Sequence, residues 1–204
     1  MIQITLPDGS VKAFEENVTP MDVAKSISEG LARNVISASF NGSTVETVTP
    51  LTTDGSLVLY TWRTDEGKKA FWHSSAHVLA QAIEELYPGA KLTIGPAIEN
   101  GFYYDVDFGS HSISENNAKA IEDKMLEIAR GKHDFKMRSA TKAEALELYK
   151  DNEFKTELIE NLEDGTITFC DHSTFTDLCR GGHIPNTSII KALKVTSLAG
   201  AYWR

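Results

Sequence analysis

The chain has 204 residues, 41% of them hydrophobic and 24% charged, and its formal net charge at pH 7 is −9. This composition is typical of a folded globular protein, and the length suits one large domain or two small ones. Only two cysteines are present, which excludes a disulfide scaffold, and we expect free thiols in a reducing cytosol, with no signal peptide or membrane span. An acidic chain also disfavours general affinity for nucleic acid, whose phosphates attract basic surfaces.

The first 62 residues predict a small α+β domain of the ubiquitin-like β-grasp type. Alternating side chains on both sides of the turn Pro7–Ser10 predict a hairpin. Thr19 and Pro20 have the N-cap and first-turn character of a helix start. The predicted elements are a hairpin of residues 2–6 and 11–14, a helix after Thr19, and strands at residues 35–40, 45–48 and 57–62. We see no catalytic constellation in this domain.

Residues 64–69 are polar and predict a linker to a second α+β domain, which we place at residues 63–204. Thr141 and Glu144 have the spacing of a capping box that opens a helix. The other predicted elements are a helix of residues 70–86, an extended stretch of residues 92–107, a long helix after Ser114, a short helix up to residue 162, and strands at residues 166–169 and 192–198.

Two pairs of side chains in the second domain indicate chemistry. His73 and His77 are four residues apart in the predicted helix, so their rings project from one face. Cys179 and His183 are also four apart, but the two glycines between them predict a turn. Together the four side chains match either a zinc ligand set or a polar pocket for proton transfer and substrate binding. A metalloprotease is excluded, because Ser74 stands where H-E-x-x-H has its glutamate.

Three further features are candidates for the same site. Asp177 precedes Cys179 by two positions and would share its strand face in an extended segment. Lys155 is open to two interpretations, a solvated lysine or a site residue. The aromatic stretch Gly101–Asp105 is open to core packing or to stacking on a terminal base.

These residues resemble the N-terminal part of the threonyl-tRNA synthetases. The matching stretches are His73–His77, Ile94–Pro96, Asn100–Asp105, Asp177–His183 and Ala199–Arg204. Their order and spacing agree over essentially the whole chain. The first 62 residues resemble the TGS module that opens such synthetases and that other translation-related proteins also carry.

The resemblance implies an editing domain that hydrolyses serine from mischarged threonine tRNA. A pocket that accepts threonine cannot exclude serine, because one missing methyl group is worth only about 1–3 kcal/mol of discrimination. By resemblance, the site residues form two sets: His73, His77 and Lys155 as catalytic residues, and Cys179, His183, Asp177 and Tyr104 as substrate-binding residues. A positioned water would attack the ester in a metal-free pocket, and the resemblance leaves the general base open.

The resemblance also implies that the family continues beyond the position of Arg204 into ligation and anticodon-binding domains. ATP and zinc would belong to the ligation domain, and the full-length enzyme would pair as a homodimer through these domains. We therefore expect the 204 residues to be a cytoplasmic editing region that binds the acceptor end of threonine tRNA, holds no cofactor of its own and does not ligate.

One departure and two alternatives bear on this expectation. The family often has proline where this chain has Gly182, which predicts a less rigid loop and a less preorganised His183. One alternative function is a zinc-dependent deacylase of the alanyl-tRNA type. The other is a non-catalytic RNA-binding module.

Overall fold

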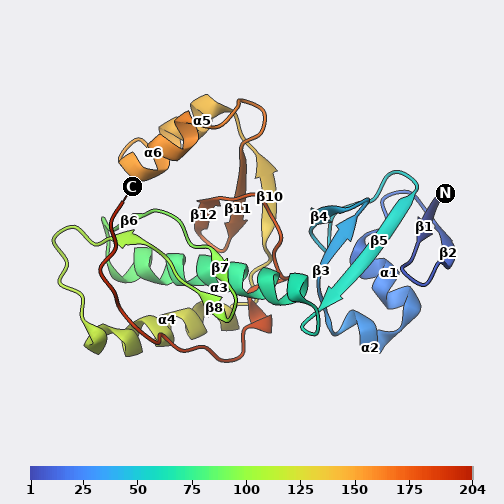
Figure 1. Cartoon of the computed structure of the whole chain (residues 1–204), viewed down its shortest axis with the longest axis horizontal. Coiled ribbons are helices and arrows are strands. Elements are labelled where there is room, and N and C mark those ends of the chain that lie inside the picture. The colour runs from blue at the N-terminus through green and yellow to red at the C-terminus, as the bar shows by residue number, and fades with distance from the viewer. Residues whose placement is uncertain (204) are drawn as a thin grey trace. The chain divides into compact units, whose positions relative to one another are not determined.

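A computed structural model of the chain describes residues 1–203, so Arg204, the last residue of the matching tail, lies outside the described residues. The chain divides into two compact units (Figure 1). The first unit comprises Met1–Ser74 and Gly181–Pro185, and the second comprises the rest. No helix in residues 1–203 is both long enough and apolar enough to cross a membrane.

The first unit contains a mixed sheet with the strand order β2-β1-β5-β3-β4. Its strands are β1 (Ile2–Thr5), β2 (Val11–Phe14), β3 (Val35–Phe40), β4 (Ser43–Val45) and β5 (Gly55–Thr61). The strands β1 and β5 pair in parallel at the centre, and the other neighbours pair antiparallel. The predicted β-grasp arrangement is therefore confirmed, although β4 ends at Val45, where the predicted strand begins.

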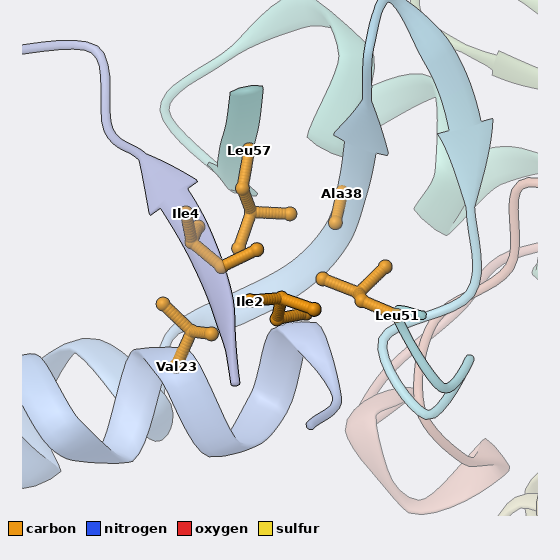
Figure 2. Close-up of a cluster of buried hydrophobic side chains, with 6 residues drawn as sticks. All are labelled: Ile2, Ile4, Val23, Ala38, Leu51 and Leu57. Atoms are coloured by element: carbon orange, nitrogen blue, oxygen red, sulfur yellow. The ribbon is translucent and has the colours of Figure 1, made fainter. Parts of the chain in front are cut away.

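The helices α1 (Pro20–Ile27) and α2 (Glu29–Ala32) follow the hairpin. A capping box opens α1: the Asp22 N–H donates to Thr19 Oγ1 (3.1 Å), and the Thr19 N–H donates to the Asp22 carboxylate (3.2 Å). Val23 points from α1 into the core of the unit (Figure 2). The buried members of this core are Ile2, Ile4, Val23, Ala38, Leu51 and Leu57.

The helix α3 (Asp65–Leu86) begins where the sequence predicts a linker, so the prediction of a linker at residues 64–69 is wrong. Thr64 caps the helix, because its Oγ1 accepts the N–H of Gly67 at 3.1 Å. Asp65 and Glu66 add negative charge to the positive end of the helix. The division between the units falls inside α3, after Ser74, and the domain boundary after residue 62 stays a prediction.

The second unit contains short helices and strands around an antiparallel sheet of order β10-β11-β12. Besides most of α3, its elements are β6 (Lys91–Leu92), β7 (Ala97–Ile98), β8 (Gly101–Phe102), β9 (Val106–Asp107), the 3-10 helix η1 (Glu115–Asn117), α4 (Ala118–Arg130), β10 (Lys136–Ser139), α5 (Lys142–Leu148), α6 (Glu153–Glu160), β11 (Thr168–His172), β12 (Phe175–Leu178) and the 3-10 helix η2 (Thr187–Ile189). The alternation along β12 buries Phe175 and Asp177 and so turns the Asp177 carboxylate inward.

Two local predictions in the second unit are wrong. Residues 192–198 form no strand; instead the Val195 N–H donates to the Glu122 carboxylate of α4 at 2.9 Å. The capping box of α5 is only half formed. Thr141 Oγ1 accepts the N–H of Glu144 at 3.1 Å, but the Glu144 carboxylate lies 2.9 Å from the Arg138 guanidinium.

The core of the first unit yields a stability prediction. Leu57→Ala should lower the free energy of unfolding by about 2–5 kcal/mol, because Leu57 is fully buried and its truncation leaves a cavity. Val11→Ala is the matched control, since Val11 is 56% exposed on β2 and its loss should cost less than about 0.5 kcal/mol. Denaturant unfolding of both variants measures the difference. Equal losses would show that Leu57 does not lie in the core.

Candidate functional site

The buried carboxylate of Asp177 organises the second unit. Its Oδ1 accepts a hydrogen bond from Lys155 Nζ at 2.6 Å. Its Oδ2 accepts the hydroxyl of Tyr104 at 2.7 Å and lies 3.1 Å from His77 Nδ1. Asp177, Lys155 and His77 are each no more than 3% exposed. A buried charge is tolerated only when it is paired and hydrogen-bonded, and Asp177 meets both conditions.

The groups that contact Asp177 determine its protonation state, and the charge of Asp177 in turn affects theirs. Burial alone would raise the pKa of Asp177, but the Lys155 ammonium and the hydrogen bond from His77 hold that pKa well below its ordinary value. Burial and the Asp177 charge raise the pKa of Tyr104 well above its ordinary value, so its hydroxyl remains a donor. Because an ionised carboxylate can only accept, we assign a proton to His77 Nδ1.

Lys155 is positioned by the start of α6. Asn152 caps this helix: its side-chain oxygen accepts the N–H of Lys155 at 3.1 Å, and its amide donates to the Leu92 carbonyl of β6 at 2.8 Å. The first turn of α6 is therefore fixed to the rest of the unit. Lys155 is 2% exposed, so the interpretation as a solvated lysine is excluded.

Cys179 lies beside His77 in the same unit. The Cys179 N–H donates to the Thr168 carbonyl at 3.0 Å, which extends the pairing of β12 with β11 by one residue. The pKa of His77 is raised although burial opposes its protonation, because Cys179 and the Asp177 carboxylate favour the charged form. The Cys179 thiol, the His77 imidazole and the Asp177 carboxylate thus lie next to one another in the interior of the unit.

The other two predicted site residues, His73 and His183, lie in the first unit. Their rings stack at 4.9 Å between centroids with an interplanar angle of 24°. His183 is completely buried, and its Nδ1 lies 2.9 Å from Oε1 of Glu46. Glu46 also accepts two backbone N–H groups, from Gly182 at 3.0 Å and from His183 at 3.1 Å.

A second side chain holds the same loop from its other end. Ser74 Oγ accepts the N–H of Ile184 at 3.0 Å and donates to the Ala70 carbonyl at 2.7 Å. Neither Glu46 nor Ser74 is among the site residues that the sequence predicts. The one signal in the sequence is that Glu46 is the single charged residue of the stretch Ser43–Val48.

Gly182 has a role in this loop that proline could not fill. It adopts φ 90°, and its N–H donates to Glu46. Proline has φ fixed near −65° and carries no N–H. The glycine that predicted a loose loop is therefore held by a hydrogen bond that the family's proline could not make.

Two domain families match the chain. Residues 2–61 match the TGS domain, and residues 167–201 match the threonyl and alanyl tRNA synthetase second additional domain. The second match includes Asp177, Cys179 and His183. Together these matches define a region of an aminoacyl-tRNA synthetase.

Relatives that are similar over the whole chain show which aminoacyl-tRNA synthetase family the region belongs to. The threonine–tRNA ligases of Flavobacterium johnsoniae, Cytophaga hutchinsonii and Desulfatibacillum aliphaticivorans are 76%, 52% and 50% identical to it. The alignments cover 100% of this chain and 32% of each relative, so the chain spans about a third of their length. The chain therefore carries the TGS and second additional domains of the threonyl-tRNA synthetase family, and the resemblance is confirmed.

The Asp177 centre yields a second prediction. Asp177→Asn should lower the free energy of unfolding at neutral pH by about 3–5 kcal/mol, because it leaves the Lys155 charge buried without its partner. Asp171→Asn is the matched control on the neighbouring strand. Asp171 pairs with a half-exposed Arg138, and such a pair is worth about 0–1 kcal/mol.

The same variant has an expected pH dependence. A carboxyl group whose pKa is depressed in the folded state stabilises fully above its unfolded pKa and loses that contribution as the pH falls. The difference between wild type and Asp177→Asn should therefore be constant near neutral pH and shrink below about pH 4, the ordinary range of an unfolded aspartate. Denaturant unfolding from pH 7 to pH 3 measures it. A difference independent of pH would show that Asp177 is not ionised in the folded protein.

Proposed function

We propose that this chain is an editing region that hydrolyses serine from mischarged threonine tRNA. The observation that carries the proposal is the buried centre of Lys155, Asp177, His77 and Tyr104, in a chain with a threonyl and alanyl tRNA synthetase second additional domain. A structural ion pair alone does not need a phenol, an imidazole and a thiol gathered around it. The pKa values of Asp177, His77 and Tyr104 are shifted by their surroundings, and such a cluster is typical of active sites.

The reaction is an ester hydrolysis. The oxygen of a water molecule attacks the carbonyl carbon of the seryl ester, and the bond from that carbon to the ribose oxygen breaks. The ribose oxygen takes up a proton, which leaves free serine and a tRNA with a free terminal hydroxyl. The chain must place the water, stabilise the negative charge that develops on the carbonyl oxygen, and assist the proton transfer.

The catalytic residues we propose are Lys155, His73 and His77. Lys155 donates to Asp177 and Tyr104 at 2.6 and 3.3 Å, which leaves a third N–H for the water or for the developing oxyanion. Its pairing with Asp177 makes it an electrostatic group rather than a base. His77, with Asp177 behind its Nδ1, is suited to proton transfer, and His73 is suited to placing the water.

The substrate-binding residues we propose are Asp177, Tyr104, Cys179 and His183. Cys179 would limit the space beside the serine side chain and so exclude the extra methyl group of threonine. Asp177 and Tyr104 would hold the amino acid and the terminal adenosine. All four assignments come from the resemblance, and the burial and mutual contacts of Asp177 and Tyr104 support their place in one site.

The proposed macromolecular partner is the acceptor end of threonine tRNA, in the cytosol. With a net charge of −9, the chain should bind tRNA weakly and with a steep salt dependence. For the whole protein we propose attachment of threonine to its tRNA, with ATP and zinc in a ligation domain and pairing as a homodimer. Those functions involve residues outside this chain.

A zinc-dependent deacylase is the second candidate, and one observation favours it. His77 and His183 each have a carboxylate at Nδ1, from Asp177 and Glu46, respectively. Zinc-bound histidines commonly have such a partner behind the ring, and in the second unit His77 lies beside Cys179, whose thiolate is also a zinc donor. A bound zinc would act as a Lewis acid in the hydrolysis.

The first test of the function compares two substrates. The chain should release serine from seryl-charged threonine tRNA faster than it releases threonine from the correctly charged tRNA. Single-turnover release of each amino acid at several salt concentrations measures the difference. Equal rates on both esters would contradict the editing function. Elemental analysis of the same protein should show well under one zinc per chain. Stoichiometric zinc, lost together with activity on chelation, would favour the second candidate.

A pair of variants separates catalysis from selectivity. His73→Ala should slow the cleavage of both esters by about 10²–10⁴-fold if His73 places or activates the water. Cys179→Ala should still release serine but should release threonine faster than wild type, because the smaller side chain leaves room for the extra methyl group. Single-turnover deacylation of both esters by each variant measures these effects.

The arrangement of thiol, imidazole and carboxylate also allows a nucleophilic Cys179, and two further measurements distinguish this role. A nucleophile would form a covalent seryl-cysteine intermediate, which mass spectrometry of the quenched reaction detects. Such an intermediate, or complete inactivation of a folded Cys179→Ser variant, would show that Cys179 attacks the ester.

A further inference from the structure

We infer that Glu46, in the TGS domain, is a positioning residue for the editing reaction, because it fixes both the place and the tautomer of His183. This inference rests on the proposed function for its effect on rate, but its effect on His183 is measurable without any reaction. It assigns to the TGS domain a part in the site that the sequence places wholly in the following domain.

Glu46 holds the turn that carries His183 through three donors. Its Oε1 receives the N–H of Gly182 and faces His183 Nδ1, and its Oε2 receives the N–H of His183. The Glu46 side chain is only 11% exposed. A nearly buried carboxylate is costly unless its oxygens accept hydrogen bonds, so the loop and Glu46 stabilise each other. This interaction also explains how a loop with two consecutive glycines is fixed.

The same carboxylate selects one tautomer of His183. Because the two oxygens of Glu46 can only accept, Nδ1 of His183 carries the proton and Nε2 is left as an acceptor in the neutral ring. The assignment follows from the hydrogen-bond network rather than from an observed hydrogen. A backbone-binding role would require only the two N–H groups of the loop. The contact with Nδ1 goes further and determines what the imidazole offers to a substrate.

Two other contacts in the first unit help to fix the position of the His183 ring. The His183 ring stacks on His73, so a shift of His183 also disturbs the residue proposed to place the water. Ser74 holds Ile184, the residue after His183, through its hydroxyl. Glu46 and Ser74 thus hold the chain on both sides of the imidazole, and the contact of Glu46 with Nδ1 also restrains rotation of the His183 ring.

The test uses the full 204-residue chain with Glu46→Gln and a matched control. Glutamine keeps the size of the side chain, but its amide nitrogen donates and cannot receive an N–H. The control is Asp54→Asn, the same change of charge in the same domain, where Asp54 Oδ1 accepts the backbone N–H of Gln3 at 2.8 Å. Glu46→Asp is the conservative variant that keeps a carboxylate. Thermal unfolding first confirms that each variant is folded.

Two measurements are made on each protein. Nitrogen-15 NMR of the imidazole should show His183 protonated at Nδ1 in wild type and in Asp54→Asn, and a mixture of tautomers in Glu46→Gln. Single-turnover serine release should fall about 10–100-fold in Glu46→Gln, the usual effect of removing a residue that orients a functional histidine. The rate should be partly restored in Glu46→Asp and unchanged in Asp54→Asn.

The outcomes separate this inference from the proposed function. If wild type releases no serine, the proposed function fails, and the tautomer measurement still decides the role of Glu46. If wild type is active and Glu46→Gln is equally fast, Glu46 is not a positioning residue for the reaction. An unchanged His183 tautomer in Glu46→Gln would overturn the inference by itself.

Discussion

The second unit depends on the interactions of the buried, ionised carboxylate of Asp177. Because it is buried, it requires a cation and further donors, and the chain supplies these from three distant segments: Lys155 on α6, Tyr104 after β8 and His77 on α3. Each partner is held in turn by its own element, as Asn152 holds the first turn of α6. The same hydrogen bonds that compensate the charge also orient the groups proposed to act on the ester.

The first unit repeats this chemistry on a smaller scale. Glu46 stands behind His183 as Asp177 stands behind His77, and in both cases the carboxylate faces Nδ1. A carboxylate in this position orients the ring and keeps a proton on Nδ1. Because Glu46 belongs to the TGS domain, that domain holds His183, a residue of the proposed editing site.

Local sequence signals were sufficient where an element is stabilised by its own residues. The hairpin around Pro7–Ser10 and the helix start at Thr19 are of this kind, and the structure confirms them. The linker was mispredicted because the polar first turn of α3 resembles a loop until the cap at Thr64 is recognised. The predicted strand at residues 192–198 failed because its apolar residues find no partner strand, and a tertiary contact to Glu122 holds the segment.

The site shows the same distinction between local and tertiary information. The spacing of His73 and His77, and of Cys179 and His183, predicts candidate site residues, because a helix or a turn fixes such spacing locally. The burial of Lys155 and the role of Glu46 depend on partners 22 and 137 residues away, and no local pattern reports them. Buried charges are paired wherever the fold brings a partner, and this is decided by the whole chain.

The central claim is that the buried centre around Asp177 receives the seryl end of a charged tRNA. Binding of a serine joined by an amide bond to 3′-amino-3′-deoxyadenosine tests it directly, because the amide mimics the ester without being cleaved readily. NMR titration of the labelled chain should show saturable shifts at His77, Tyr104 and the Lys155 side chain, with weaker binding of the threonyl analogue. Shifts confined to other residues, or equal affinity for the two analogues, would contradict the account.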